Sequence, residues 1–179
     1  DYRELLAARR TDIAIISTWT DTHSKIASSA IESGVKLIVL EKPVSHSLKE
    51  SAEMIRKAGK NGATVIVNHE RRFDSRYRRV RSMLEDGAIG RIISVNARMH
   101  TGRYRGSSSV LEGGGPLLHD GTHLVDILRF FFGEIESANG SFSRIERLKG
   151  YEDAAAAWLK TASGIDIFLE AGGGRKYFL

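Results

Sequence analysis

Two histidines and an aspartate, His119, His123 and Asp126, are spaced so that they could share one face of a helix. Side chains that are four and then three residues apart lie one above the other on an α-helix. A His-x-x-x-His pair with a nearby carboxylate has the spacing of metal ligands. The same spacing suits a histidine that polar neighbours hold as a general acid/base. The three residues therefore indicate a site rather than a solvated polar face, and both kinds of chemistry stay open.

The segment that carries these residues has the signals of an amphipathic helix. Pro116 follows three glycines and suits the first helical position, and Gly133 suits the end. Between them, apolar residues such as Leu117, Leu124 and Leu128 recur with a 3.6-residue period. We therefore expect one helix between Pro116 and Gly133, anchored by its apolar side, with the polar stripe roughly opposite.

Lys42 is a second candidate for chemistry. It follows the apolar run that ends at Leu40 and precedes Pro43, which stiffens the loop and can form a cis bond. A solvated surface charge is the ordinary alternative for a lysine. The carboxyl end of a parallel strand is where open α/β sheets bind ligands, so this position favours function.

The first part of the chain alternates short apolar strands with helices. Strands are predicted at 12–17, 35–40 and 62–68, and helices at 24–33 and 47–59. This alternation predicts a parallel sheet with right-handed crossovers. A polar cluster follows each strand, so the three clusters should meet at one edge of the sheet. His69, in the third cluster, has no evident partner and is predicted to be structural.

After residue 72 the pattern changes. Predicted elements are a helix at 74–86, strands at 91–100, 135–145, 153–161 and 164–171, and a Gly/Ser-rich loop at 101–115. Strands that follow one another without helices predict a mainly antiparallel, open sheet. The fold class is therefore α/β, with a parallel domain over 1–72 and an α+β domain over 73–179.

Composition narrows the function classes. The chain has 179 residues and no cysteine, which excludes disulfides, thiolate metal sites and a cysteine nucleophile. No apolar run approaches the roughly 18 residues of a membrane span. The net charge is +5, but the arginines between Arg71 and Arg81 scatter round their helix without nucleic-acid motifs, so no nucleic-acid partner is expected. The chain opens at Asp1 without a signal peptide, and we expect a fragment of a cytoplasmic protein.

Four stretches together resemble the Gfo/Idh/MocA oxidoreductase family, the relatives of glucose–fructose oxidoreductase and inositol dehydrogenase. In chain order they are Ser17-Thr-Trp-Thr-Asp-Thr-His23, Glu41-Lys-Pro43, Asn68-His-Glu-Arg-Arg-Phe-Asp74 and the glycine-led helix from Gly113 to Asp126. Each motif is weak by itself, but their order and spacing are specific and span most of the chain. The resemblance implies the back half of a Rossmann domain followed by an α+β substrate domain.

The resemblance also implies roles for single residues. Lys42 would contact the reacting oxygen near the nicotinamide of NAD or NADP, and His123 would pass the proton during hydride transfer. The substrate would be a secondary alcohol of a sugar or cyclitol-like molecule. Implied cofactor contacts are Thr18, Thr20, His23, Glu41, Lys42 and Pro43, and implied substrate contacts are Arg72, His119 and Asp126. The implied assembly is a homo-oligomer through the open sheet, without a membrane partner.

Two departures from the family pattern stand out. His119 occupies the position of the family's first aspartate in the helix motif, and Asp120 is one position off. The 179 residues also contain no G-x-G-x-x-G phosphate loop and no acidic ribose-binding residue before Tyr2. We therefore expect a piece that is truncated at both ends, binds nicotinamide nucleotides weakly and is inactive by itself.

Two other function classes remain as alternatives. One is a metal-dependent hydrolase or lyase that uses His119, His123 and Asp126, although the preferred assignment has no metal. The other is a non-catalytic binding or dimerisation module built on the open sheet. Metal analysis would test the first alternative, and cofactor titration would test the second.

Overall fold

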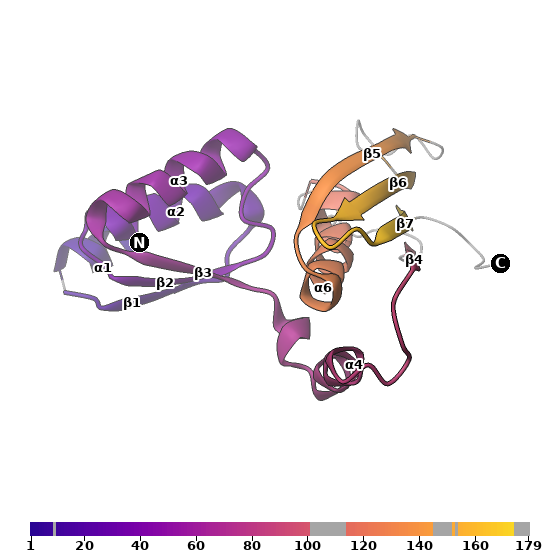
Figure 1. The fold of residues 1–179 in the computed structure, drawn as a ribbon. Coiled ribbons are helices and arrows are strands. Elements are labelled where there is room, and N and C mark those ends of the chain that lie inside the picture. The colour runs from indigo at the N-terminus through magenta and orange to yellow at the C-terminus, as the bar shows by residue number, and fades with distance from the viewer. Residues whose placement is uncertain (9, 101–113, 145–151, 153, 174–179) are drawn as a thin grey trace. The chain divides into compact units, whose positions relative to one another are not determined.

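The fold is that of a computed structural model, which describes residues 1–8, 10–100, 114–144, 152 and 154–173 (Figure 1). The chain divides into two compact units, Asp1–Asn68 and His69–Leu179, which we call unit 1 and unit 2. Most of the predicted loop at 101–115 lies outside the described residues. No helix among those described is long and apolar enough to span a membrane.

Unit 1 is a three-stranded parallel sheet in the order β1-β2-β3, with α2 and α3 along one face (Figure 1). Its elements are α1 (Tyr2–Ala8), β1 (Ile13–Ile16), α2 (Thr20–Glu32), β2 (Leu37–Glu41), α3 (Leu48–Asn61) and β3 (Thr64–Asn68). The predicted alternation and parallel pairing are confirmed. The strands are short and rich in isoleucine, leucine and valine, as buried parallel strands usually are.

The core of unit 1 lies between the sheet and these two helices. Ile38 and Leu40 of β2 are fully buried there, against Ile31 of α2 and Met54 of α3. Side chains alternate along a strand, so residues such as Ile15, which is 75% exposed, lie on the opposite face. The helix-covered face therefore supplies most of the burial in this unit.

Two helix starts show how local chemistry sets the ends. Ser47, the first residue of the helix predicted at 47–59, caps α3, since its side chain accepts a hydrogen bond from Glu50 N at 3.4 Å. Helix α2 begins at Thr20, before the predicted residue 24. Thr22 Oγ1 donates to Trp19 O at 2.7 Å, which closes the first turn early. The predicted polar loop after β1 is therefore partly helical.

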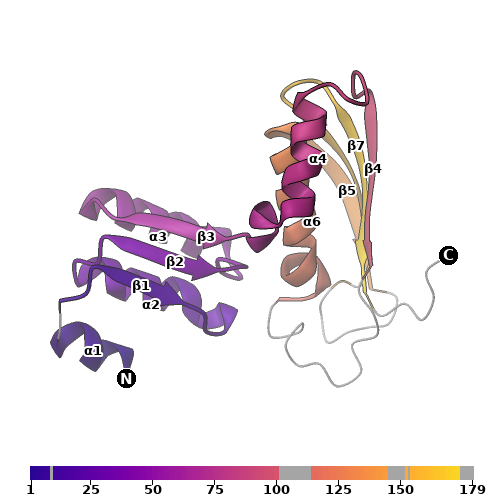
Figure 2. The same cartoon turned by 90° about the horizontal axis from the view of Figure 1, so that it is seen from below.

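Unit 2 contains a four-stranded mixed sheet in the order β4-β7-β6-β5 (Figure 2). Its elements are η1 (Glu70–Phe73), α4 (Ser75–Glu85), β4 (Ser94–His100), η2 (Leu117–Gly121), α6 (Thr122–Phe132), β5 (Ile135–Ser143), β6 (Ala154–Thr161) and β7 (Asp166–Gly172). β4 pairs with β7 in parallel, and the other two pairings are antiparallel. The predicted mainly antiparallel sheet is therefore confirmed.

The core of unit 2 lies between α6 and one face of this sheet (Figures 1 and 2). Leu128 of α6 is buried with Leu159 of β6 and Ile167 of β7. On the opposite face, Trp158 and Phe168 stack with ring centroids 5.9 Å apart and are each about half exposed. The helix is thus held by its apolar side, as the sequence predicted.

Candidate functional site

The strand ends of unit 1 bring polar groups to one edge of the sheet. Glu41 closes β2 and pairs in register with Asn68 at the end of β3. Asn68 Nδ2 donates to Glu41 Oε1 at 2.6 Å. Lys42 follows directly, and its bond to Pro43 is cis. The register of the paired strands therefore places these polar groups at the same edge of the sheet, as predicted.

His23 connects the two loops that leave β1 and β2. It is 1% exposed, and its Nδ1 lies 2.8 Å from Pro43 O while its Nε2 lies 3.0 Å from Thr18 O. A carbonyl oxygen can only accept a hydrogen bond and a neutral imidazole has one N–H, so the neutral ring donates to one of the two carbonyls and packs its other nitrogen against the second. His23 was predicted to line the cofactor, but its ring nitrogens are directed at the backbone. Its geometry suits a residue that positions the loop bearing Lys42.

The predicted threonines differ in environment. Thr20 begins α2 and is 5% exposed. Thr18 lies at an exposed position, where its Oγ1 is 2.7 Å from Thr22 Oγ1. Thr18 is thus better placed than Thr20 to meet a ligand from solvent.

The predicted single helix of unit 2 is interrupted. Leu117–Gly121 forms a π turn, and the regular helix α6 begins at Thr122. A π turn holds more residues than an α turn, so the regular 3.6-residue spacing that related His119 to His123 and Asp126 does not apply across it. At Gly121 an added Cβ would lie 2.8 Å from Leu117 Cδ1. The expectation of one regular helix from Pro116 to Gly133 was wrong because it assumed an uninterrupted 3.6-residue period.

The remaining two residues of the stripe are buried. His123 and Asp126 are each 6% exposed, which agrees with the expectation of a site rather than a solvated polar face. His119 lies before α6, and its Nδ1 is 2.9 Å from Asp120 Oδ1. His119 thus contacts Asp120, its neighbour in sequence, whereas His123 and Asp126 lie against η1.

Asp126 is held by an arginine from η1. Arg72 Nε lies 3.0 and 2.9 Å from Asp126 Oδ1 and Oδ2, and Arg72 Nη2 lies 2.7 Å from Oδ1. The hydrogen bond to Asp126 raises the pKa of the Arg72 guanidinium above its usual value. Such bidentate pairs fix geometry as well as charge. The two residues were predicted to bind substrate, and here they bind each other.

His69 joins this pair, although the sequence assigned it no partner. Its Nδ1 lies 3.7 Å from Asp126 Oδ2. Burial lowers the pKa of the His69 imidazole below its ordinary value and outweighs the opposing effect of the Asp126 carboxylate. The neutral imidazole is thus favoured in the folded protein.

His123 also faces a carboxylate that the sequence did not single out. Its Nδ1 lies 3.6 Å from Oε1 of Glu70, which is itself half exposed on η1. Both newly found residues, His69 and Glu70, lie in the stretch after β3. In the sequence the two residues stand immediately before two arginines, which marks a polar cluster but identifies no partner. Their partners on α6 are more than fifty residues away along the chain.

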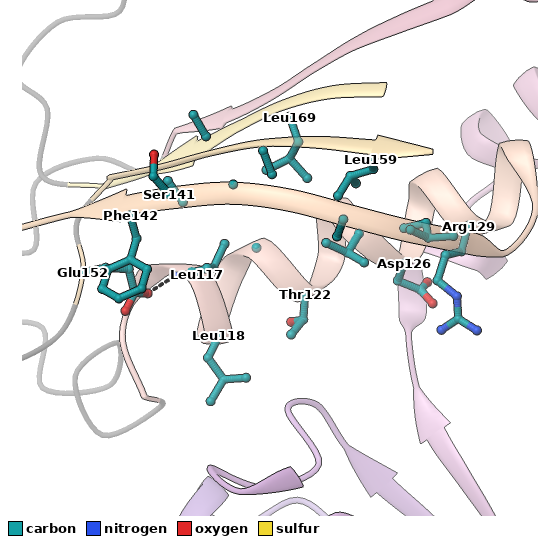
Figure 3. A pocket seen from close by; sticks show the side chains of 18 of the residues that line it. Leu117, Leu118, Thr122, Asp126, Arg129, Ser141, Phe142, Glu152, Leu159 and Leu169 are labelled. Atoms are coloured by element: carbon teal, nitrogen blue, oxygen red, sulfur yellow. Dashed lines mark hydrogen bonds between the residues drawn. The ribbon is translucent and has the colours of Figure 1, made fainter. Parts of the chain in front are cut away.

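A cavity of about 700 Å³ lies between β5, β6 and the η2–α6 segment of unit 2 (Figure 3). Its walls are mostly apolar, with Leu117, Leu159 and Leu169 among them. Asp126 and Arg129 lie at one end, and at the other the Glu152 carboxylate accepts a hydrogen bond from Leu117 N at 2.9 Å. Among the described residues that line it, Asp126 is the one that was predicted to belong to the site.

The metal alternative finds no supporting geometry in the described part of the chain. No group of three or more His, Cys, Asp or Glu side chains there is arranged to hold a metal ion. His119 lies within the π turn and contacts Asp120, and Arg72 binds the Asp126 carboxylate. The general acid/base interpretation of His123 needs no such cluster.

Two family models match the chain in sequence. Residues 1–69 match the oxidoreductase family with the NAD-binding Rossmann fold, and residues 77–177 match the GFO/IDH/MocA C-terminal domain. The two matches meet close to the division between the two units. Each unit therefore has its own counterpart in the family.

Curated proteins and a solved structure agree with these matches. The uncharacterized oxidoreductase YrbE of Bacillus subtilis is 31% identical over 133 residues, which cover 74% of this chain and 39% of that protein. D-apiose dehydrogenase of Paraburkholderia graminis is 27% identical over 168 residues, which cover 92% and 44%. The crystal structure of an inositol dehydrogenase homolog from Azotobacter vinelandii, complexed with NADH and myo-inositol, superposes with a TM-score of 0.85 at 22% identity and covers 98% of this chain and 50% of that one.

The chain spans half or less of the length of these relatives. The family matches nevertheless extend over nearly all of its residues and agree with both sheet topologies. The chain belongs to the Gfo/Idh/MocA oxidoreductase family.

Proposed function

We propose that the protein containing this chain is a nicotinamide-dependent oxidoreductase that oxidises a secondary alcohol reversibly. The observation that carries the proposal is a pair of residues in a chain of this family. Lys42 follows a strand in the unit that matches an NAD-binding fold, and His123 is buried beside a carboxylate in the following unit. A lysine and a histidine are the groups that such a reaction needs for its oxygen and its proton.

The residues of unit 1 fit the nicotinamide end of such a cofactor. Parallel strands end together at the edge that bears Glu41, Lys42 and Asn68, and ligands of open parallel sheets bind there. Thr18 and Glu41 would line the cofactor, and His23 and Pro43 would hold the loop. When bound, the nicotinamide supplies the hydride acceptor of the reaction. NAD and NADP are equally compatible with these residues.

In this proposal Lys42 stabilises the charge that develops on the alcohol oxygen, and His123 transfers the hydroxyl proton. Lys42 donates to the reacting oxygen and stabilises the negative charge that develops there. His123 accepts the hydroxyl proton in the oxidative direction and returns it in the reductive direction. Arg72 and Asp126 shape the site by fixing η1 on α6 rather than by contacting substrate.

The substrate class in this proposal is a sugar or a cyclitol. Support comes from the family and from the names of two relatives, one a D-apiose dehydrogenase and one complexed with myo-inositol. We further propose a cytoplasmic protein that associates through the open sheet face bearing Trp158 and Phe168. Light scattering of the full-length protein and of a Trp158→Glu variant would test that association.

Steady-state kinetics of the full-length protein would test the reaction. Sugars and cyclitols are screened for formation of reduced nicotinamide, and His123→Asn is compared with the wild type. The variant should lose roughly 10²–10⁴ in rate, the usual contribution of a positioned acid/base. His46→Asn, at an exposed position, is the matched control. Full activity of His123→Asn would reject the assignment, and absence of nicotinamide binding would favour a non-catalytic module.

A further inference from the structure

We propose that Glu70 is a positioning residue for His123, which it orients through Nδ1 so that Nε2 is presented to the substrate hydroxyl. The inference deepens the proposed function and rests on it. It starts from the 3.6 Å separation between His123 Nδ1 and Glu70 Oε1. The His123 side chain is 8% exposed, whereas that of Glu70 is 55% exposed, so the carboxylate approaches from the open side of a buried ring.

The contact is one of several between the same pair of elements. Glu70 and Arg72 lie two residues apart on η1, and their partners His123 and Asp126 lie one turn apart on α6. The bidentate Arg72–Asp126 pair fixes η1 against α6 and so fixes the backbone that carries Glu70. The backbone of Glu70 is therefore fixed near His123 by the rest of η1. The pair then has to order only the Glu70 side chain.

A carboxylate at Nδ1 has a definite effect on imidazole chemistry. At the 3.6 Å ion-pair distance it favours the neutral form with hydrogen on Nδ1, because the negative carboxylate attracts the positive end of the N–H bond. The lone pair then lies on Nε2, which can take the proton from the alcohol O–H while the C–H hydride leaves for the nicotinamide. The carboxylate also favours the imidazolium that this proton transfer creates. Glu70 thus acts through His123 and does not itself exchange a proton with substrate.

The other carboxylates on η2 and α6 have different contacts. Asp120 lies 2.9 Å from His119, and Asp126 is bound by Arg72. The elements that pack against α6 carry further titratable and charged groups. They are His69, Arg71 and Arg72 at η1, Arg76, Tyr77, Arg78, Arg79, Arg81 and Glu85 on α4, Arg98 and His100 on β4, His119 and Asp120 on η2, Lys160 on β6, and Asp166 and Glu170 on β7. Most of these groups are cationic when charged, so loss of Glu70 would leave His123 in more positive surroundings.

Histidine-detected NMR of this chain would test the pair without any need for turnover. In the wild type, neutral His123 should carry its hydrogen on Nδ1. Glu70→Ala should shift the tautomer toward Nε2–H and lower the pKa of His123 by about half a unit to one unit, as expected for a partly exposed ion pair. Glu70→Asp should restore part of both effects, and Glu85→Ala should change neither. Unchanged signals of the other histidines would show that the variants fold.

The pH profile of the full-length enzyme would connect the pair to catalysis. Glu70→Gln should move the acid limb of kcat/KM to lower pH by the same half unit to one unit and lower kcat about three- to tenfold. An unaltered tautomer and pKa in Glu70→Ala would overturn the inference. If the NMR effects appear but His123→Asn keeps full activity, the Glu70–His123 pair stands and the proposed function fails.

Discussion

The two units hold their candidate groups by different means. In unit 1, His23 binds the carbonyl oxygens of Thr18 and Pro43, so the loop that carries Lys42 is fixed through the backbone. In unit 2, ion pairs between side chains do the equivalent work, as in the pair of Arg72 with Asp126. Hydrogen bonds from a neutral ring to backbone carbonyls depend little on salt, whereas ion pairs are screened by it. The candidate groups of unit 2 should therefore be the more sensitive to charge substitutions and salt.

The distribution of tryptophan allows the units to be measured separately. The chain has two tryptophans, Trp19 in unit 1 and Trp158 in unit 2. Fluorescence of a Trp19→Phe variant reports on unit 2, and that of Trp158→Phe reports on unit 1. Each stability prediction below can thus be made for one unit, with the other as an internal control.

The largest expected effect concerns Lys42 of unit 1. In the full-length enzyme, Lys42→Met should lower kcat by about a hundredfold or more, as loss of a single donor to developing negative charge typically does. Cofactor affinity should change little, because the interaction is made mainly in the transition state. Lys49→Met, an exposed lysine at the start of α3, serves as the control. Normal turnover of Lys42→Met would make Lys42 an ordinary surface lysine.

The next effect concerns the ion pair of unit 2. Arg72→Met leaves Asp126 buried without its partner and should destabilise unit 2 by about 2–3 kcal/mol, below the range for fully buried pairs because Arg72 is 37% exposed. Adding Asp126→Leu should recover most of this loss. Denaturant titration followed by Trp158 measures the change. Equal destabilisation of the single and double variants would show that the charge of Asp126 is not the cause.

A smaller effect is expected for the backbone tie of unit 1. His23→Leu removes the ring hydrogen bond to the loop carbonyls and should destabilise unit 1 by about 1–2 kcal/mol. In contrast with Arg72→Met, the loss should be nearly independent of salt, since no ion pair is broken. Trp19 fluorescence is measured at low and high salt, with the exposed His46→Leu as a control. A strong salt dependence would contradict the proposed contrast between the units.

The smallest predicted effect concerns acid and His69. Because the pKa of His69 is lowered in the folded state, the unfolded chain binds more protons just below the ordinary value of about 6.5. Stability from the neutral ring is therefore fully present above that value and is lost as the pH falls below it. Between about pH 6.5 and 5 the free energy of unfolding of unit 2 should fall, by less than the loss caused by Arg72→Met. In His69→Gln this dependence on pH should be flatter. An unchanged slope in His69→Gln would assign the acid sensitivity to another group.

Sequence reasoning succeeded where the information is local. Apolar runs gave the strands, and the rule that parallel strands end together placed Glu41 and Lys42 at one edge. Ser47 marked the start of α3, but the helix continues past the predicted residue 59 to Asn61 and ends at Gly62, which adopts the left-handed conformation with φ of 61°. The fold class and the edge of unit 1 could be predicted because each depends on a short window of residues.

The site of unit 2 could not be predicted in the same way. Glu70 and Arg72 contact α6 only after the chain has folded, and nothing in the local sequence pairs them with His123 and Asp126. The error at His119 had a different cause. Hydrophobic periodicity extends across 117–132, and a π turn does not alter the residue types enough to be seen in that pattern.

The π turn also affects how the length of the segment before α6 can vary. A π turn is equivalent to a helix with one residue inserted, so shortening Leu117–Gly121 by one residue would restore a regular helix. The segment before the turn would then keep its facing, because the bulge alone accommodates the additional residue. Residues after it, His123 among them, would keep their places on α6 because sheet and η1 hold that helix. The turn thus allows the lead-in to the helix to change in length by one residue while the groups on either side stay in register.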